Sequence, residues 1–436
     1  MQSHARNVNE KEWTMIDAAP ANTKQVLTAS LVGTAIEFYD FYIYATAASL
    51  VFGPLFFPTS SSSVQLLSAY ATFGIAFVAR PVGSIAFGHF GDRIGRKSTL
   101  VASLLLMGGS TFLIAFLPTY AMIGWIAPLL LCLLRFGQGF GLGGEWGGAA
   151  LLAVENAPPG WRARFGMFPQ LGAPLGFILA NGLFLLLGLS LTPEQFLNWG
   201  WRLPFLASAA LVIVGLWIRL RLTETPAFAA ELAKGHPPAV PLFEVIKDHP
   251  RALICGTFAA VACFAIFYLT TAFALGYGTN TLKIPRDTFL GLQLGAILFL
   301  AAGIIISGYW ADAANARRVL MAGCLATMPV ALMLSSMMQS GSLPLIFAFL
   351  AAGLFVMGLV YGPLGGFLPS LFPARVRYTG ASIAFNVGGI FGGALTPLAA
   401  QALAERGGLM WVGLYLAGAA LISFVALQSL PPETGE

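Results

Sequence analysis

The stretch Gly88-His-Phe-Gly-Asp-Arg-Ile-Gly-Arg-Lys97 decides how the rest of the chain is interpreted. It contains one acidic residue, three cationic residues and three glycines, and long apolar runs flank it on both sides. A polar segment this short between two such runs is expected to be a loop that ties two membrane helices together. It also places positive charge on one side of the bilayer.

A degraded copy of this stretch, Gly308–Arg318, lies in the second half of the chain. Gly308 and Asp312 repeat the spacing of the first copy, and Arg317 falls at the position of its lysine. The two copies are 220 residues apart in a chain of 436. A repeated helix-loop-helix element at this separation predicts two similar halves.

The composition excludes a soluble protein. The chain is 57% hydrophobic and 9% charged, whereas soluble domains carry about 25% charged residues. The net charge of +5 could suggest nucleic-acid binding, but in a membrane protein positive residues anchor the cytoplasmic loops. We therefore expect the lipid bilayer as the surroundings and no nucleic-acid partner.

A membrane-spanning helix needs about 20 apolar residues, and this rule predicts an all-α membrane protein with twelve spans. The predicted spans are 27–54, 66–89, 98–117, 122–152, 164–189, 203–220, 251–277, 288–311, 318–339, 343–369, 378–403 and 408–430. The predicted domains are a tail (1–26), a six-helix bundle (27–220), a central linker (221–250), a second six-helix bundle (251–430) and a tail (431–436). Lys and Arg number 17 at the termini and even-numbered connections and 4 at the odd-numbered ones, which predicts cytoplasmic termini.

Two acidic residues lie within the first predicted span. Glu37, Asp40 and Tyr44 are spaced to share one face of a helix, and a charge inside a span costs about 2.5–3.5 kcal/mol. We expect this face to point into the bundle and to carry a proton, a cation or part of a substrate. The alternative is an acid held permanently by a neighbouring helix.

Arg135 and Gln138 lie within the fourth predicted span. An arginine there keeps its charge and needs an anionic partner, from the protein or from a ligand. We expect Asp40 or Glu37 to pair with Arg135 at rest and to release it for an anionic substrate when protonated. A permanent structural ion pair is the alternative.

The glycines that follow Arg135 include a literal GxGxxG at Gly139, Gly141 and Gly144, but no strand precedes it, so a dinucleotide site is rejected. Their GxxxG spacings instead predict close helix packing. Charged residues near the same end of spans four and five are expected to close the cytoplasmic side with the Asp92 segment, unless they are solvated loop charges. They are Glu145, Glu155, Arg162 and Arg164.

The second half has no charge well inside a span, so its candidates are neutral polar residues. They are Tyr268, Thr270, Thr271, Gln293, Tyr361 and Asn386. Enzyme motifs such as HExxH, a Walker A sequence or a nucleophile elbow are absent from the sequence. The four cysteines form no CxxC pair, and we expect neither a metal nor a cofactor.

These segments resemble the major facilitator superfamily. Its loop signature is similar to Gly88–Lys97, its span-four signature to Arg135–Gly139, and its signature after span six to Leu222–Phe228. More narrowly, the chain is similar to the metabolite:H⁺ symporter family in four segments of the first half. They are Ile36–Phe41, Ala79–Gly83, Gly143–Gly148 and Trp199–Arg202.

The resemblance implies a secondary transporter of a bacterial inner membrane, driven by protons, with two six-helix bundles and a central site. That family carries dicarboxylates, citrate, shikimate, and proline or betaine. Two departures are Ala316 at the position of Arg96 in the second copy, and Phe38 where many relatives have Trp.

We expect symport of a small organic acid with a proton, and no obligatory protein partner. Asp40 and Glu37 are the candidates for the proton. The expected substrate-binding residues are Arg135, Tyr44, Gln138, Tyr268 and Asn386. The expected gating residues are Gly88, Asp92, Arg93, Gly95, Arg96, Lys97, Asp312 and Arg317. The alternatives are a proton-coupled proline or betaine carrier and, in another class, an ion channel or membrane sensor.

Overall fold

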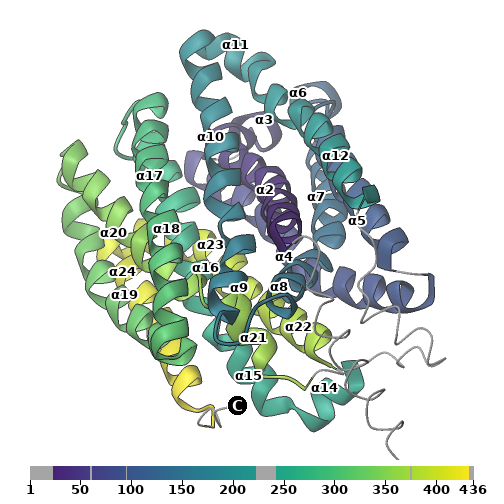
Figure 1. Cartoon of the computed structure of the whole chain (residues 1–436). Coiled ribbons are helices and arrows are strands. Elements are labelled where there is room, and N and C mark those ends of the chain that lie inside the picture. The colour runs from purple at the N-terminus through teal and green to yellow at the C-terminus, as the bar shows by residue number, and fades with distance from the viewer. Residues whose placement is uncertain (1–22, 59–60, 95, 222–241, 374–375, 432–436) are drawn as a thin grey trace, which may run out of the picture.

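The computed structural model describes residues 23–58, 61–94, 96–221, 242–373 and 376–431, and these residues form helices and connecting turns (Figure 1). The first half contains α2 (Thr23–Ala47), η1 (Ala48–Phe52), α3 (Gly53–Phe56), α4 (Ser62–Ile94), α5 (Arg96–Ile114), α6 (Tyr120–Ile123), α7 (Ile126–Leu142), α8 (Glu145–Glu155), α9 (Arg162–Gln170), α10 (Gly172–Ser190), α11 (Pro193–Asn198), η2 (Gly200–Arg202) and α12 (Leu203–Arg221). The second half contains α14 (Leu242–Asp248), α15 (Pro250–Ala259), α16 (Val261–Tyr268), η3 (Leu269–Phe273), α17 (Ala274–Asn280), α18 (Arg286–Ala314), α19 (Ala316–Met338), α20 (Leu343–Tyr361), α21 (Leu364–Ser370), α22 (Arg377–Gly389), η4 (Ile390–Ala394), α23 (Leu395–Gly407) and α24 (Leu409–Gln428).

Each of the twelve predicted spans coincides with one helix or with a run of consecutive helices. Ten helical stretches of the described chain are long and apolar enough to cross a membrane, and Val101–Ile114 is a shorter apolar helix. The first predicted span, with its two acids, is α2 with η1 and α3. Leu133, Leu186, Ile213 and Leu298 are each more than half exposed, as lipid-facing side chains are.

We expected a loop at each copy of the polar motif, but the structure shows that both copies are almost entirely helical. α4 ends at Ile94 and α5 begins at Arg96, while α18 ends at Ala314 and α19 begins at Ala316. In the second copy Asn315 (φ 150°) makes the turn alone, and its Oδ1 accepts from the backbone amide of Arg317 at 2.8 Å. One capping residue is enough to start the next helix, so no longer loop is needed.

Some of the residues singled out in the sequence lie outside what the structure describes. Gly95 is one, and the segment Leu222–Phe228 falls within the undescribed residues 222–241. For the other gating residues of the first copy the structure describes the backbone and not the side chains: Gly88, Asp92, Arg93, Arg96 and Lys97. Within the predicted linker, α14 forms a short helix whose Val245 packs against Phe372 and Val376.

Figure 1 shows α11 at one end of the bundle and α14 at the other, and we name the ends after these helices. At the α11 end the hydroxyls of Ser49 and Tyr70 donate to the backbone carbonyl of Ala272, at 3.1 and 2.8 Å. At the α14 end the Asn386 amide donates to the carbonyl of Gly143 at 3.0 Å. The two halves are therefore bonded to each other on both sides of their common centre.

The glycine-rich span packs closely, as its spacing predicted. A methyl group on Gly139 would overlap the backbone of Ala76, and one on Gly143 would overlap the carbonyl oxygen of Arg80, so both glycines bring α7 against α4. Gly141 faces α5 instead, where a Cβ would lie 2.8 Å from the backbone nitrogen of Met107.

Candidate functional site

Asp40 lies inside the first half, where α2 packs against α12. Its exposed fraction is 0%, and the hydroxyl of Ser208 donates to its Oδ1 at 2.5 Å. The Oδ2 atom is also buried and has no hydrogen-bond partner. This carboxyl group therefore keeps one oxygen free to take up a proton or a further donor.

Arg135 does not form the ion pair with Asp40 that we expected. Its guanidinium donates to Oε1 of Gln138 and to the backbone carbonyl of Phe73, the latter at 3.5 Å. It also lies over three aromatic rings, with centroids at 4.0 Å (Tyr44), 4.4 Å (Phe41) and 5.0 Å (Phe73). Ring faces attract a desolvated cation and here take part of the role of an anionic partner.

Gln138 links the two charged residues without bringing them together. While its Oε1 accepts from Arg135, its Nε2 donates to the backbone carbonyl of Asp40 at 2.9 Å and to the hydroxyl of Thr111 at 2.8 Å. The Asp40 side chain points to Ser208 instead. The expected ion pair between Asp40 and Arg135 is wrong. Their positions in the sequence put both residues near the middle of their spans, but did not determine which way each side chain points.

A small cavity lies between the two halves. Its lining is aromatic, with a small number of polar and charged groups. From the first half it is lined by Glu37, Phe38, Tyr42, Arg80, Trp146 and Ala173, and from the second by Cys263, Phe264, Phe267, Tyr268, Met357, Tyr361 and Phe385. We call it the central cavity. Its two charged lining residues are Glu37 and Arg80.

Arg80 is the functional candidate that sequence reasoning left out of the site. It is 5% exposed, and its Nε is buried without a hydrogen-bond partner. Its guanidinium lies 4.4 Å from the ring centroid of Phe41 and 5.0 Å from that of Phe77. The signal was a cation inside a span, directly before Pro81, and an arginine there needs a partner.

The aromatic walls of the central cavity are fixed by contacts between the halves. The rings of Trp146 and Phe385 stack with centroids 3.7 Å apart and planes at 5°. Trp146 Nε1 donates to Gln170 at 3.1 Å, and the Gln170 amide donates to the carbonyl of Tyr361 at 3.0 Å. The Tyr361 hydroxyl is itself buried without a partner, so it is a second unused donor beside Arg80.

The predicted site residues divide into two groups. Glu37 and Tyr268 line the central cavity. The others are buried outside its lining: Asp40, Tyr44, Arg135, Gln138 and Asn386. Glu37 and Asp40 were expected to share a face, but residues three apart differ by about 60° around a helix. That angle is enough to turn Glu37 to the cavity and Asp40 to α12.

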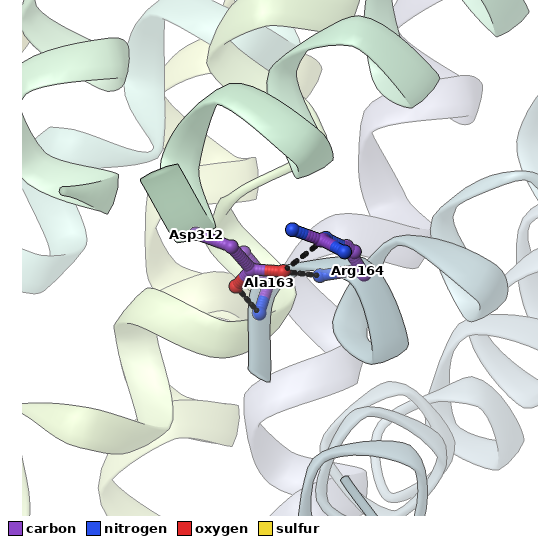
Figure 2. A network of polar contacts seen from close by, with 3 residues as sticks. All are labelled: Ala163, Arg164 and Asp312. Carbon is purple, nitrogen blue, oxygen red and sulfur yellow. Dashed lines mark hydrogen bonds and ion pairs between the residues drawn. The ribbon is translucent and has the colours of Figure 1, made fainter. Parts of the chain in front are cut away.

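Asp312 joins the two halves at the α14 end (Figure 2). Its carboxylate, on α18, accepts from the backbone amides of Ala163 at 2.8 Å and Arg164 at 3.1 Å, in the first turn of α9. Arg164 Nε pairs with the same carboxylate at 3.0 Å. A carboxylate is favourable at a helix N-terminus because the unpaired amides there are electropositive.

The rest of the predicted gating and closing residues lie elsewhere. Arg317 donates to the carbonyls of Gln428 and Pro431, at 2.8 and 3.0 Å, and so holds the end of α24. Glu145 is buried and accepts from the Ser103 hydroxyl at 2.8 Å, within the first half. Glu155 and Arg162 are exposed.

Comparison with known proteins identifies the relatives of this chain. The sequence pattern of the Major Facilitator Superfamily matches residues 30–390. The inner membrane metabolite transport protein YhjE of Escherichia coli is 49% identical over 98% of both chains. The Escherichia coli shikimate transporter is 37% identical over 92% of this chain and 93% of its own length. The Salmonella typhimurium proline/betaine transporter is 31% identical, over 94% and 84% respectively.

Among solved structures, the xylose transporter XylE of Escherichia coli in a partially occluded inward-open conformation has a similar fold. Its TM-score is 0.75, over 95% of this chain and 99% of that chain, at 16% identity. At this identity the likeness is one of fold, and it agrees with twelve membrane helices in two bundles.

Proposed function

The chain belongs to the Major Facilitator Superfamily and is a multi-pass secondary transporter of the inner membrane, not an enzyme, and from this premise we propose that it carries a small organic acid together with a proton. The proposal adds to the family membership a substrate class, a coupling ion and the residues that bind each of them.

One observation supports the substrate class above the others: Arg80 lines the central cavity with a buried Nε that has no protein partner. A guanidinium only donates hydrogen bonds, and its planar fork matches a carboxylate. In an aromatic cavity an anionic ligand would complete its hydrogen bonding, and the Tyr361 hydroxyl offers a further donor. Arg80 thus takes the role that we expected of Arg135.

The proton is assigned to the acids of α2. Glu37 lines the central cavity, and Asp40 lies one turn further along α2 with its Oδ2 unpartnered. Arg135 and Gln138 support this region through the backbone carbonyl of Asp40. In this mechanism the substrate anion binds at Arg80 and one of the two acids, Asp40 or Glu37, binds the proton. The contacts at the α11 end and at the α14 end then break in turn.

A second candidate is the transport of a zwitterion such as proline or betaine. Glu37 lies in the same cavity as Arg80, and aromatic faces attract ammonium groups. A ligand with both charges would place an opposite charge near each of these residues. A channel or sensor, the candidate of another class, is not favoured by any contact described here.

The test is uptake into vesicles that contain the purified protein, driven by an imposed inward proton gradient. The panel is labelled mono-, di- and tricarboxylates, with proline and betaine. Saturable uptake of a carboxylate supports the proposal, uptake of the zwitterions alone selects the second candidate, and non-saturable ion flux indicates a channel.

Arg80→Gln is expected to reduce carboxylate uptake by about ten- to a hundredfold, since it removes charge-assisted hydrogen bonds. Arg318→Gln, which removes an exposed arginine outside the cavity, is the matched control and should transport normally. Undiminished uptake by a well-folded Arg80→Gln variant would contradict the binding role.

A further inference from the structure

A second small cavity lies on the α11 side of the central one. It is lined by Tyr42, Ala45, Thr46 and Phe177 from the first half and by Thr271, Ala272, Leu275 and Gln293 from the second. We call it the outer cavity. Tyr42 belongs to the lining of both cavities, and its ring packs against Phe177 and Phe267 with centroids 5.5 and 5.3 Å away. The two cavities are therefore neighbours that share the wall formed by Tyr42.

Apart from Tyr42, the polar side chains of the outer cavity have already used their donors. The Thr46 hydroxyl donates to Asn181 at 2.6 Å, and the Thr271 hydroxyl donates to the carbonyl of Phe267 at 2.6 Å. Both amide hydrogens of Gln293 are occupied by the carbonyls of Thr270 and Thr271, at 3.1 and 2.8 Å. These carbonyls belong to η3, a π-helical turn, which changes the usual pairing of helix carbonyls.

Beside the Tyr42 hydroxyl, what remains in the outer cavity is a set of acceptors. Gln293 keeps its Oε1, and the hydroxyl oxygens of Thr46 and Thr271 keep lone pairs. None of these residues carries charge. A carboxylate, which only accepts, would find no donor among them, whereas a ligand hydroxyl would find several acceptors.

The central cavity supplies the donors that the outer cavity lacks. Arg80 and Tyr361 each have a buried polar atom without a partner, and both atoms carry a hydrogen to donate. A molecule that extends from one cavity to the other past Tyr42 would meet donors at one end and acceptors at the other. This polarity is built from both halves of the protein.

We infer that the outer cavity is a second subsite for the substrate, which takes hydroxyl groups while the carboxylate binds at Arg80. The inference rests on the proposed function and narrows it: the substrate is a hydroxylated monocarboxylate rather than a di- or tricarboxylate. A second carboxylate in the outer cavity would lose its hydration and could gain only the Tyr42 hydroxyl as a donor.

The experiment compares matched acids that differ in hydroxyl groups: quinate against cyclohexanecarboxylate, and gluconate against hexanoate. Binding is measured by thermal shift and by calorimetry on the purified full-length protein. The wild type is expected to prefer the hydroxylated acid of at least one pair by tenfold or more. Thr271→Val and Gln293→Leu should each reduce this preference by about five- to tenfold, the loss expected for one or two hydrogen bonds.

Thr270→Val is the matched control. Thr270 neighbours Thr271 on η3, is fully buried, and donates to the carbonyls of Ile266 and Phe267 at 2.8 and 3.1 Å, but it lines neither cavity. Its substitution should leave the preference unchanged. Thr271→Val keeps the shape of the side chain, so the test stands even if Gln293→Leu does not fold.

The outcomes separate this inference from the proposed function. Equal binding of both acids in each pair, with loss of binding in Arg80→Gln, overturns the outer subsite and leaves the carboxylate site intact. A hydroxyl preference that depends on Thr271 but not on Arg80 supports the subsite and overturns the assignment of Arg80. Failure of every acid to bind overturns both.

Discussion

The two acids of α2 are three residues apart but have different surroundings. Glu37 lines the central cavity, whereas Asp40 contacts Ser208 of α12 and is absent from the cavity lining. A substrate in the cavity therefore meets Glu37 directly and senses Asp40 only through α2. This separation suits a coupling site that binds a proton without competing for the substrate.

Asp40→Asn is expected to abolish accumulation driven by a proton gradient and to preserve exchange of the same substrate across the membrane. The amide cannot take up the proton, yet the lining of the central cavity is unchanged. Accumulation and counterflow in the same vesicles measure the two activities, and we expect at least a tenfold loss of the first alone.

Glu194→Gln provides the control, since Glu194 is an exposed acid on α11. Should Asp40→Asn accumulate substrate normally, the proton site would have to be moved to Glu37 and tested there with Glu37→Gln. Loss of exchange as well as accumulation would instead indicate that Asp40 supports the structure of the binding site.

The sequence predicted which residues are unusual but not where they point. Arg80 and Arg135 are both arginines within spans, and the cost of a buried charge singles out both. Arg135 has its charge covered by ring faces and Gln138, whereas the Nε of Arg80 is left open beside the cavity. Only the packing of the second half, which supplies most of the cavity's aromatic residues, distinguishes them.

Among the helices, α4 and α7 make one of the closest contacts in the first half, and three glycines allow it. Gly139 on α7, Gly143 directly after α7 and Gly83 on α4 have no space for a methyl group, because backbone atoms of the facing segment occupy it. The same contact sets the position of Arg80, whose carbonyl faces Gly143. Packing of this pair therefore determines where the guanidinium reaches.

Gly139→Ala is expected to lower the stability of the protein by about 1–3 kcal/mol, the usual cost of overpacking a close contact. Its methyl group would meet the backbone of Ala76, which cannot move aside as a flexible side chain can. Gly182→Ala on α10, where nothing lies within 4 Å, is the control and should melt like the wild type. Equal melting temperatures of the two variants in the same detergent would refute the argument.

Element positions followed from hydropathy, but element boundaries did not. Apolar length predicted every span, because lipid tolerates little else. The single-residue turn at Asn315 could not be expected from length alone, since it depends on a capping side chain and on φ 150°. The π-helical turns η1, η3 and η4 also escaped prediction, since neither apolar length nor helical periodicity marks them.

At the scale of the whole molecule, closure at the two ends rests on different kinds of contact. The α14 end combines the Asp312 carboxylate with close backbone packing, in which Gly166 of α9 meets Gly365 and Gly366. The α11 end depends on two hydroxyls that donate to one carbonyl, that of Ala272. Alternating access requires each end to open separately. Because the contacts at the two ends differ, a substitution can weaken one end without affecting the other.

Gly365→Ala should favour opening of the α14 end, because its methyl group would press on the backbone of Gly166. The double variant Ser49→Ala/Tyr70→Phe should favour opening of the α11 end, because it leaves the Ala272 carbonyl without its two donors.

Chemical labelling of Cys263 measures the opening of either end, since this cysteine lines the central cavity and is fully buried in the structure. The other cysteines, Cys132, Cys255 and Cys324, are replaced by serine for the measurement.

A membrane-impermeant thiol reagent is applied to vesicles of either orientation, and labelling of Cys263 is measured from each side. Gly365→Ala should raise labelling severalfold from the α14 side, which the charge bias of the connections predicts to be cytoplasmic, and the double variant should raise it from the other side. Gly291→Ala, whose methyl group would touch nothing within 4 Å, should change neither. If both variants raised labelling from the same side, the two ends would not be independent closures, and the central cavity would not be reached alternately.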